Sequence, residues 1–158
     1  MKTKTIFVTR AAIVAALYVV LTYVANLLGL ASGNIQVRFS ESLTILPIFF
    51  PEAIWGLTVG CLLANLLTGA SLMDIIFGTL ATLIGAVGTR FLRKSVPAAI
   101  SSPILANTVI IPFVLAYSYN IHPIWLSMLT VGVGEVISCG VLGTALYFWV
   151  KKNRHLLK

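Results

Sequence analysis

The chain has 158 residues, of which 59% are hydrophobic and 9% are charged. Soluble domains carry about 25% charged residues, so this composition excludes a soluble globular protein and predicts an all-α integral membrane protein with a single membrane domain, residues 1–158. Long apolar runs favour helices over barrel strands, whose alternating pattern is weaker. The net charge of +7 does not indicate a nucleic-acid partner, because the basic residues cluster at the ends of apolar runs.

We predict six transmembrane helices from the apolar runs and the signals that flank them. The first run follows three basic residues and resembles a signal peptide, but its 18 residues from Ala11 to Leu28 exceed the usual apolar core of about 7–15. We therefore expect an uncleaved membrane helix there. Pro47 interrupts the second helix, and Pro51, Pro97 and Pro123 mark the starts of the third, fifth and sixth. The predicted helices cover residues 6–30, 41–50, 52–67, 72–91, 97–117 and 123–150.

The distribution of charge predicts the orientation of these helices. Six crossings place both termini and the loops after the second and fourth helices on one face, and ten of the eleven basic residues fall there. Only Arg38 lies on the opposite face. By the positive-inside rule, we expect a multi-pass protein of the cell (plasma) membrane with both termini in the cytoplasm.

Polar residues inside the apolar runs are the candidates for a binding site, because a charge near the bilayer centre costs on the order of 2.5–3.5 kcal/mol. Glu135 lies 12 residues beyond Pro123, which places it ~18 Å deep in a helix and near the middle of the bilayer. A ligand or proton site explains such a residue, and so does a protonated carboxyl group bonded to a neighbouring helix. We expect one cavity opening outward, lined by Arg38, Glu41, Asn65, Asp74, Asn107 and Glu135.

Several of these residues also have a purely structural interpretation. Arg38 and Glu41 are three apart where a helix begins and could form a local ion pair. Ser71-x-x-Asp74 matches a capping box. The two asparagines could bridge helices by hydrogen bonds.

Small residues form a stripe on the first helix. Ala11, Ala12, Ala15 and Ala16 make two overlapping Ala-x-x-x-Ala pairs, and small residues four apart let another helix approach closely in lipid. Spacing alone does not decide between a partner protein and this protein's own helices.

The chain carries no enzyme motif, such as a Gly-x-x-x-x-Gly-Lys phosphate loop or His-Glu-x-x-His. We therefore predict that it is not an enzyme and that any ATP hydrolysis belongs to partner chains. Cys61 and Cys139 lie in apolar runs without metal-ligand spacing, so we expect small buried side chains, no metal and no cofactor.

Four segments together resemble the QueT family. They are QVRFSESLTILP at 36–47, FPEAI at 50–54, GCLLANLL at 60–67 and LMDIIFGTLATL at 72–83. The resemblance implies the substrate-binding S component of an energy-coupling factor (ECF) transporter, a six-helix bundle with a site open to the outside. It further implies a queuosine precursor (a deazaguanine base) as substrate, a membrane coupling subunit and two ATPases as partners, and docking through the alanine stripe.

Three other readings stay open from the residues themselves. A related S component could bind another vitamin-like molecule with the same residue types. A stand-alone proton-coupled carrier could use Glu135, and a scaffold could use its polar residues only to pack helices. A flat base suits amide and carboxylate partners, with a stacking ring supplied by one of Phe39, Tyr117, Tyr119 or Trp125.

Overall fold

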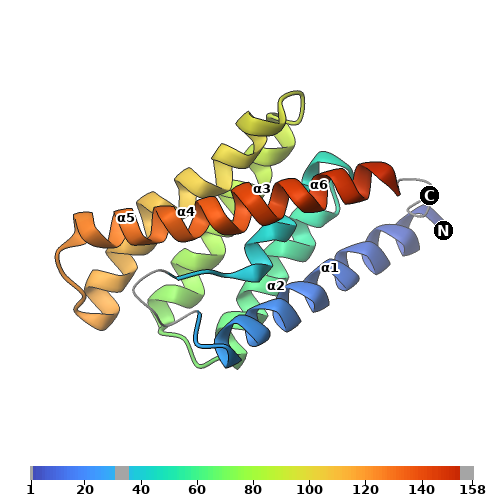
Figure 1. The fold of residues 1–158 in the computed structure, drawn as a ribbon. Coiled ribbons are helices and arrows are strands. Elements are labelled where there is room, and N and C mark those ends of the chain that lie inside the picture. Colours follow the sequence, from blue (N-terminus) through green and yellow to red (C-terminus); the bar gives the residue numbers. More distant parts are fainter. Residues whose placement is uncertain (1, 31–35, 154–158) are drawn as a thin grey trace.

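The computed structural model describes residues 2–30 and 36–153, and these residues confirm the prediction of an all-α membrane protein (Figure 1). η1 is a 3₁₀ helix, and η2 and η3 are π-helical turns that continue directly into α3 and α6. The described residues therefore form six helical segments. The elements are α1 (Lys2–Leu27), η1 (Phe39–Ile48), α2 (Ala53–Leu67), η2 (Asp74–Gly78), α3 (Thr79–Phe91), α4 (Val96–Tyr119), α5 (Ile124–Glu135), η3 (Val136–Leu142) and α6 (Gly143–Lys152).

Four segments are long and apolar enough to cross a bilayer: Lys4–Leu27, Asp74–Phe91, Val96–Tyr119 and Ile124–Lys152. η1 and α2 are shorter, with 10 and 15 residues. The predicted second helix at 41–50 is thus not a full α-helical span. It is an almost wholly buried 3₁₀ helix. A 3₁₀ helix rises ~2.0 Å per residue, so ten residues reach ~20 Å where an α-helix would reach ~15 Å.

The contact between α1 and α2 uses the Gly56-x-x-x-Gly60 pair and explains part of the alanine stripe. A Cβ atom at Gly56 would lie 2.6 Å from the carbonyl oxygen of Ala11, and one at Gly60 would lie 3.0 Å from the Cα atom of Ala15. Ala15 is buried in this contact. The backbone of Ala11 and of Ala15 thus contributes to the contact with α2 within this chain, and Ala15 is not accessible for docking.

The other two alanines, Ala12 and Ala16, are exposed. They lie on a different side of α1 from the contact with α2, since a helix turns by about 100° per residue. These two are the exposed members of the four, whereas Ala11 is partly buried and Ala15 is buried.

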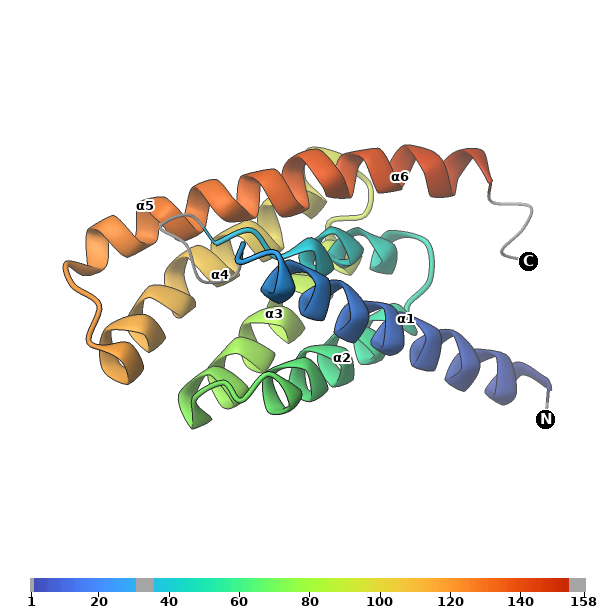
Figure 2. The ribbon, with the colours of Figure 1, turned by 60° about the horizontal axis from the view of Figure 1, so that its bottom comes forward.

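The start of α1 and the end of α6 lie at the same end of the molecule in both views (Figures 1 and 2). We call this the basic end. Here Arg10 forms a 3.0 Å salt bridge with Glu52. Arg90 donates to the carbonyl oxygens of Pro47 and Ile48 at 3.1 and 3.2 Å. Arg90 thereby satisfies carbonyl groups that the end of η1 leaves without partners in the helix.

Candidate functional site

A cavity of about 350 Å³ with a partly polar lining lies at the end of the molecule opposite the basic end. We call it the polar cavity. Its walls come from the last turns of α1, α2 and α4, the segment before η1, and the turn that begins η2. It is lined by Thr22, Asn26, Gln36, Arg38, Asn65, Thr68, Gly69, Ala70, Asp74, Leu115, Tyr119 and Ile121.

The structure divides the six predicted site residues into two groups of three. Arg38, Asn65 and Asp74 line the polar cavity. Glu41, Asn107 and Glu135 are buried and are not among its lining residues. The expectation that all six line one cavity is thus wrong for the second group. We call that group, with Tyr18 and Cys139, the buried carboxyl cluster.

Asp74 is held in place from both sides by hydrogen bonds. Its amide nitrogen donates to Ser71 Oγ at 3.1 Å, which is one of the two bonds of the predicted capping box, and Ser71 Oγ donates to Asp74 Oδ2 at 3.2 Å. The second capping-box bond is replaced, because the Ser71 amide nitrogen donates to Tyr119 OH at 3.2 Å. Tyr119 OH donates to the same carboxylate oxygen at 2.8 Å, and Asn65 Nδ2 donates to the backbone oxygen of Asp74 at 3.1 Å. Asp74 therefore bonds to Ser71 at the start of the helix and also lines the polar cavity.

The π-helical turns coincide with both groups. η2 begins at Asp74, and η3 begins immediately after Glu135. Such turns are rare and occur often at functional sites, because the extra residue re-aims side chains and breaks the regular ladder. One turn thus shapes the cavity wall and the other shapes the buried cluster.

The buried carboxyl cluster joins α1, η1, α4, α5 and η3. Glu41 is 1% exposed and Glu135 is 6% exposed. Tyr18 OH donates to Glu41 Oε1, Cys139 Sγ lies 3.2 Å from Glu135 Oε2, and Asn107 is close enough to interact with both carboxyl groups. A carboxylate oxygen of Glu41 and one of Glu135 lie within 4.8 Å of each other.

Arg38 connects the two groups. It interacts electrostatically with Glu41 in the cluster and with Asp74 in the cavity. It does not form the short local ion pair with Glu41 that the spacing allows, since the salt bridge within residues 4–30 and 36–153 is that between Arg10 and Glu52. A ligand in the polar cavity would therefore contact the Arg38 guanidinium group, which interacts with the carboxyl groups of Glu41 and Asp74.

Glu41, Glu135 and Cys139 also place one potential ligand atom each within 4.8 Å of one another. Cys139 Sγ lies 3.2 Å from Glu135 Oε2 and 3.4 Å from Thr44 Oγ1, and Tyr18 donates to Glu41 Oε1, whereas Glu41 Oε2 has no hydrogen-bond partner among the described residues. We interpret the group as a hydrogen-bonded cluster rather than a metal centre.

Sequence reasoning did not single out Tyr18, because a lone tyrosine in an apolar helix is usually a packing residue. The signal in the sequence was the spacing of Tyr18 and Thr22, which lie one helical turn apart. In the structure, both hydroxyl groups face η1. Tyr18 contacts Glu41, and Thr22 Oγ1 lies 2.9 Å from Ser40 Oγ.

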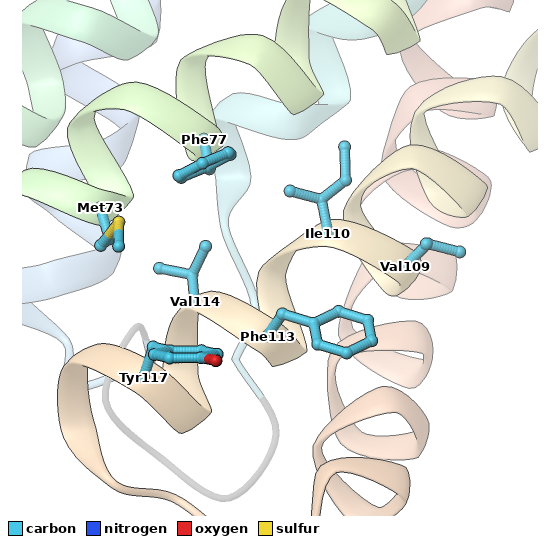
Figure 3. Close-up of a pocket in the computed structure, with 7 residues that line it drawn as sticks. All are labelled: Met73, Phe77, Val109, Ile110, Phe113, Val114 and Tyr117. Carbon is cyan, nitrogen blue, oxygen red and sulfur yellow. The ribbon is translucent and has the colours of Figure 1, made fainter.

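The four aromatic residues predicted to stack on a base lie in different parts of the structure. Tyr119 lines the polar cavity. Tyr117 lines a second pocket of about 380 Å³ between η2 and α4, with Met73, Phe77, Val109, Ile110, Phe113 and Val114 (Figure 3). The lining of this second pocket is apolar apart from one tyrosine hydroxyl, so it does not offer the donors and acceptors that a nucleobase needs. Phe39 and Trp125 line neither pocket.

Comparison with known proteins identifies the family of the chain. A family model described as QueT transporter matches residues 8–152. A protein of Lactococcus lactis subsp. cremoris (strain MG1363) named queuosine precursor transporter QueT is 41% identical over 83 residues, which are 52% of this chain and 48% of that protein. The match thus spans about half the length of this relative. No solved structure matches the chain.

Proposed function

Because this chain belongs to the QueT transporter family, we propose that it is the substrate-binding S component of an ECF importer. It captures a queuosine precursor, a deazaguanine base, outside the cell and passes it to an ATP-driven module. The observation that carries the proposal is the polar cavity, which opens at one end of a chain that is otherwise 59% hydrophobic. In a membrane protein, such polar groups usually mark a substrate pathway.

The lining of the cavity suits a flat base with several hydrogen-bonding groups. Arg38 supplies donors, Asp74 supplies acceptors, and Asn65 supplies both. Tyr119 adds a ring whose hydroxyl group is already occupied by Asp74. The volume of about 350 Å³ lies in the lower part of the usual range for small-molecule sites, ~300–1,000 Å³, as a single base requires.

The buried carboxyl cluster acts behind this lining. This cluster stabilises the positive charge of Arg38 and fixes the orientation of its side chain through Glu41, Asn107 and Glu135. Asp74 is the carboxylate that contacts the ligand. An aminomethyl base, which is a cation, pairs with Asp74, whereas a neutral relative depends more on Arg38 and Asn65.

The orientation and the partners complete the proposal. The basic end faces the cytoplasm, as the positive-inside rule requires, and the polar cavity faces outward. A membrane coupling subunit and two ATPase subunits supply the energy, because the chain itself carries no phosphate-binding motif.

Ligand binding tests the proposed site. We expect Asp74→Asn to weaken binding of an aminomethyl deazaguanine by roughly tenfold or more, since ~1.4 kcal/mol is one decade and a buried charge left unpaired costs more than that. We expect Glu135→Gln to weaken it less, because Glu135 lies behind Arg38. Calorimetry on the purified variants measures both effects, with a neutral deazaguanine as the matched control ligand.

Equal losses for the charged and neutral ligands in Asp74→Asn would contradict the assigned role of Asp74. Mass spectrometry of small molecules retained by the purified protein tests the substrate class itself. Retention of a molecule other than a deazapurine would replace the proposed substrate while leaving the cavity as its site.

Coupling is tested on the two exposed alanines. We expect Ala12→Trp or Ala16→Trp to prevent co-purification with the coupling subunit and to spare ligand binding, because a bulky ring holds two helices apart in lipid. The matched control is Leu105→Trp on α4, a position that is also exposed. Normal assembly of both alanine variants would show that this side of α1 does not dock.

A further inference from the structure

A groove opens between α4 and α6 at the basic end of the molecule. Its cavity volume is about 470 Å³, and its lining includes Val96, Pro97, Ile100 and Ile104 from α4 and Thr144 and Phe148 from α6. The residues of the polar cavity and of the buried carboxyl cluster are not part of it. The function proposed above makes no use of this groove.

The packing of α4 explains why the groove exists. The first half of α4 is held against α3, since a Cβ atom at Gly85 would lie 2.7 Å from the Cα atom of Pro103 and one at Gly88 would lie 2.0 Å from Ser102 Oγ. The second half of α4 packs against α5. α4 and α6 therefore separate toward the start of α4, as Figure 1 shows.

Basic side chains stand at both rims of the groove. Arg93 and Lys94 lie in the turn just before Val96 and are exposed. Lys152, also exposed, follows Phe148 by one helical turn on the same side of α6. Within the part of the chain that the structure describes, none of the three forms a salt bridge with a carboxylate.

The shape of the groove matches a lipid chain in one leaflet. Its lining runs from Val96 to Ile104, which is ~12 Å along a helix at ~1.5 Å per residue. One leaflet contributes ~15 Å of the ~30 Å hydrocarbon core. An acyl chain in the groove would thus place its headgroup at the level of the three basic side chains.

From this charge complementarity we propose that the groove is a binding site for an anionic phospholipid. The acyl chain packs against Ile100, Ile104 and Phe148, and the phosphate group pairs with Arg93, Lys94 and Lys152. Basic pockets between helices at a membrane surface favour such headgroups, and each basic residue near the surface adds to the attraction. A zwitterionic lipid fills the same groove but binds less tightly, because its headgroup has no net negative charge to pair with the three basic side chains.

The test is a lipid titration of the purified protein in neutral detergent, followed by native mass spectrometry. The probes are phosphatidylglycerol and phosphatidylcholine with identical chains. We expect phosphatidylglycerol to bind the unaltered protein roughly tenfold more tightly than phosphatidylcholine, and we expect Arg93→Gln with Lys94→Gln to remove most of that preference. These two positions lie in an exposed turn outside the helices, so the double variant is expected to fold normally.

Two further variants make the result specific to this groove. Lys2→Gln with Lys4→Gln removes the same charge from the start of α1 and is expected to leave the preference unchanged. Thr144→Phe fills the groove and is expected to weaken both lipids. Equal affinity of the unaltered protein for the two lipids, an equal loss in both double variants, or no effect of Thr144→Phe would each overturn the proposal.

Discussion

Replacing Gly134 by alanine is expected to reduce ligand affinity by at least about tenfold, a loss of ~1.4 kcal/mol or more. Gly134 is buried on α5, where the segment that leads to Arg38 passes directly over the helix. An added Cβ atom would lie 2.0 Å from the carbonyl oxygen of Gln36 and 2.9 Å from its carbonyl carbon. Both are backbone atoms, so no side-chain rotation relieves the clash, and the whole segment must move.

Movement of this segment changes the wall of the polar cavity, because Gln36 and Arg38 both line it. Displacing their backbone by an ångström changes the position of the cation that the proposed ligand meets and of the acids behind it. In enzymes, a misplacement of ~1 Å can cost about a hundredfold in rate, and the same sensitivity to geometry is expected of a binding site. Alanine favours a helix over glycine by about 1 kcal/mol, which offsets part of the cost of displacing the segment.

Gly132 provides the matched control on the same helix. A Cβ atom there would meet Thr108 Cγ2 at 3.4 Å, which is ordinary van der Waals contact. We expect Gly132→Ala to leave ligand affinity within about twofold, since surface-like substitutions usually change free energies by less than ~0.5 kcal/mol. Calorimetry with a deazaguanine ligand compares the two variants, and equal affinities would show that the segment over Gly134 does not form part of the site.

Removing the hydroxyl group of Tyr18 is expected to destabilise the fold by about 1–3 kcal/mol, the cost of leaving a buried polar partner without its hydrogen bond. Tyr18 is 1% exposed and donates to Glu41 Oε1. The other oxygen of the same carboxyl group, Oε2, already has no hydrogen-bond partner among residues 4–30 and 36–153. In Tyr18→Phe, Glu41 would therefore lose its tyrosine donor in a site that water does not reach.

Tyr23→Phe is the control for this change, because it removes the same atom from the same helix at a side chain that is 49% exposed. We expect its free energy of unfolding to change by less than about 0.5 kcal/mol. Denaturation of both purified variants in one detergent measures the difference. If Tyr18→Phe unfolds at the same point as Tyr23→Phe, the bond between Tyr18 and Glu41 contributes nothing to the stability of the buried carboxyl cluster.

Local patterns in the sequence predicted the features that depend on near neighbours. Hydropathy predicted an all-helical membrane protein, and Ser71-x-x-Asp74 predicted a capping box, of which the bond from the Asp74 amide nitrogen to Ser71 Oγ is present. The family resemblance is confirmed by the match over residues 8–152. These properties follow from spacing within a few turns of one helix, which is what a linear pattern records.

The tertiary structure alone decided which polar and small residues come together. Glu41 and Glu135 are 94 residues apart in the sequence, and no pattern within one helix states that they share a cluster while Asp74 lines a cavity. In the same way, Ala15 is buried only because Gly60 on another helix admits it, whereas Ala16 beside it stays exposed. Helical spacing determines the depth of a residue in the membrane. Whether its side chain contacts another helix, a cavity or lipid depends on where the neighbouring helices pack.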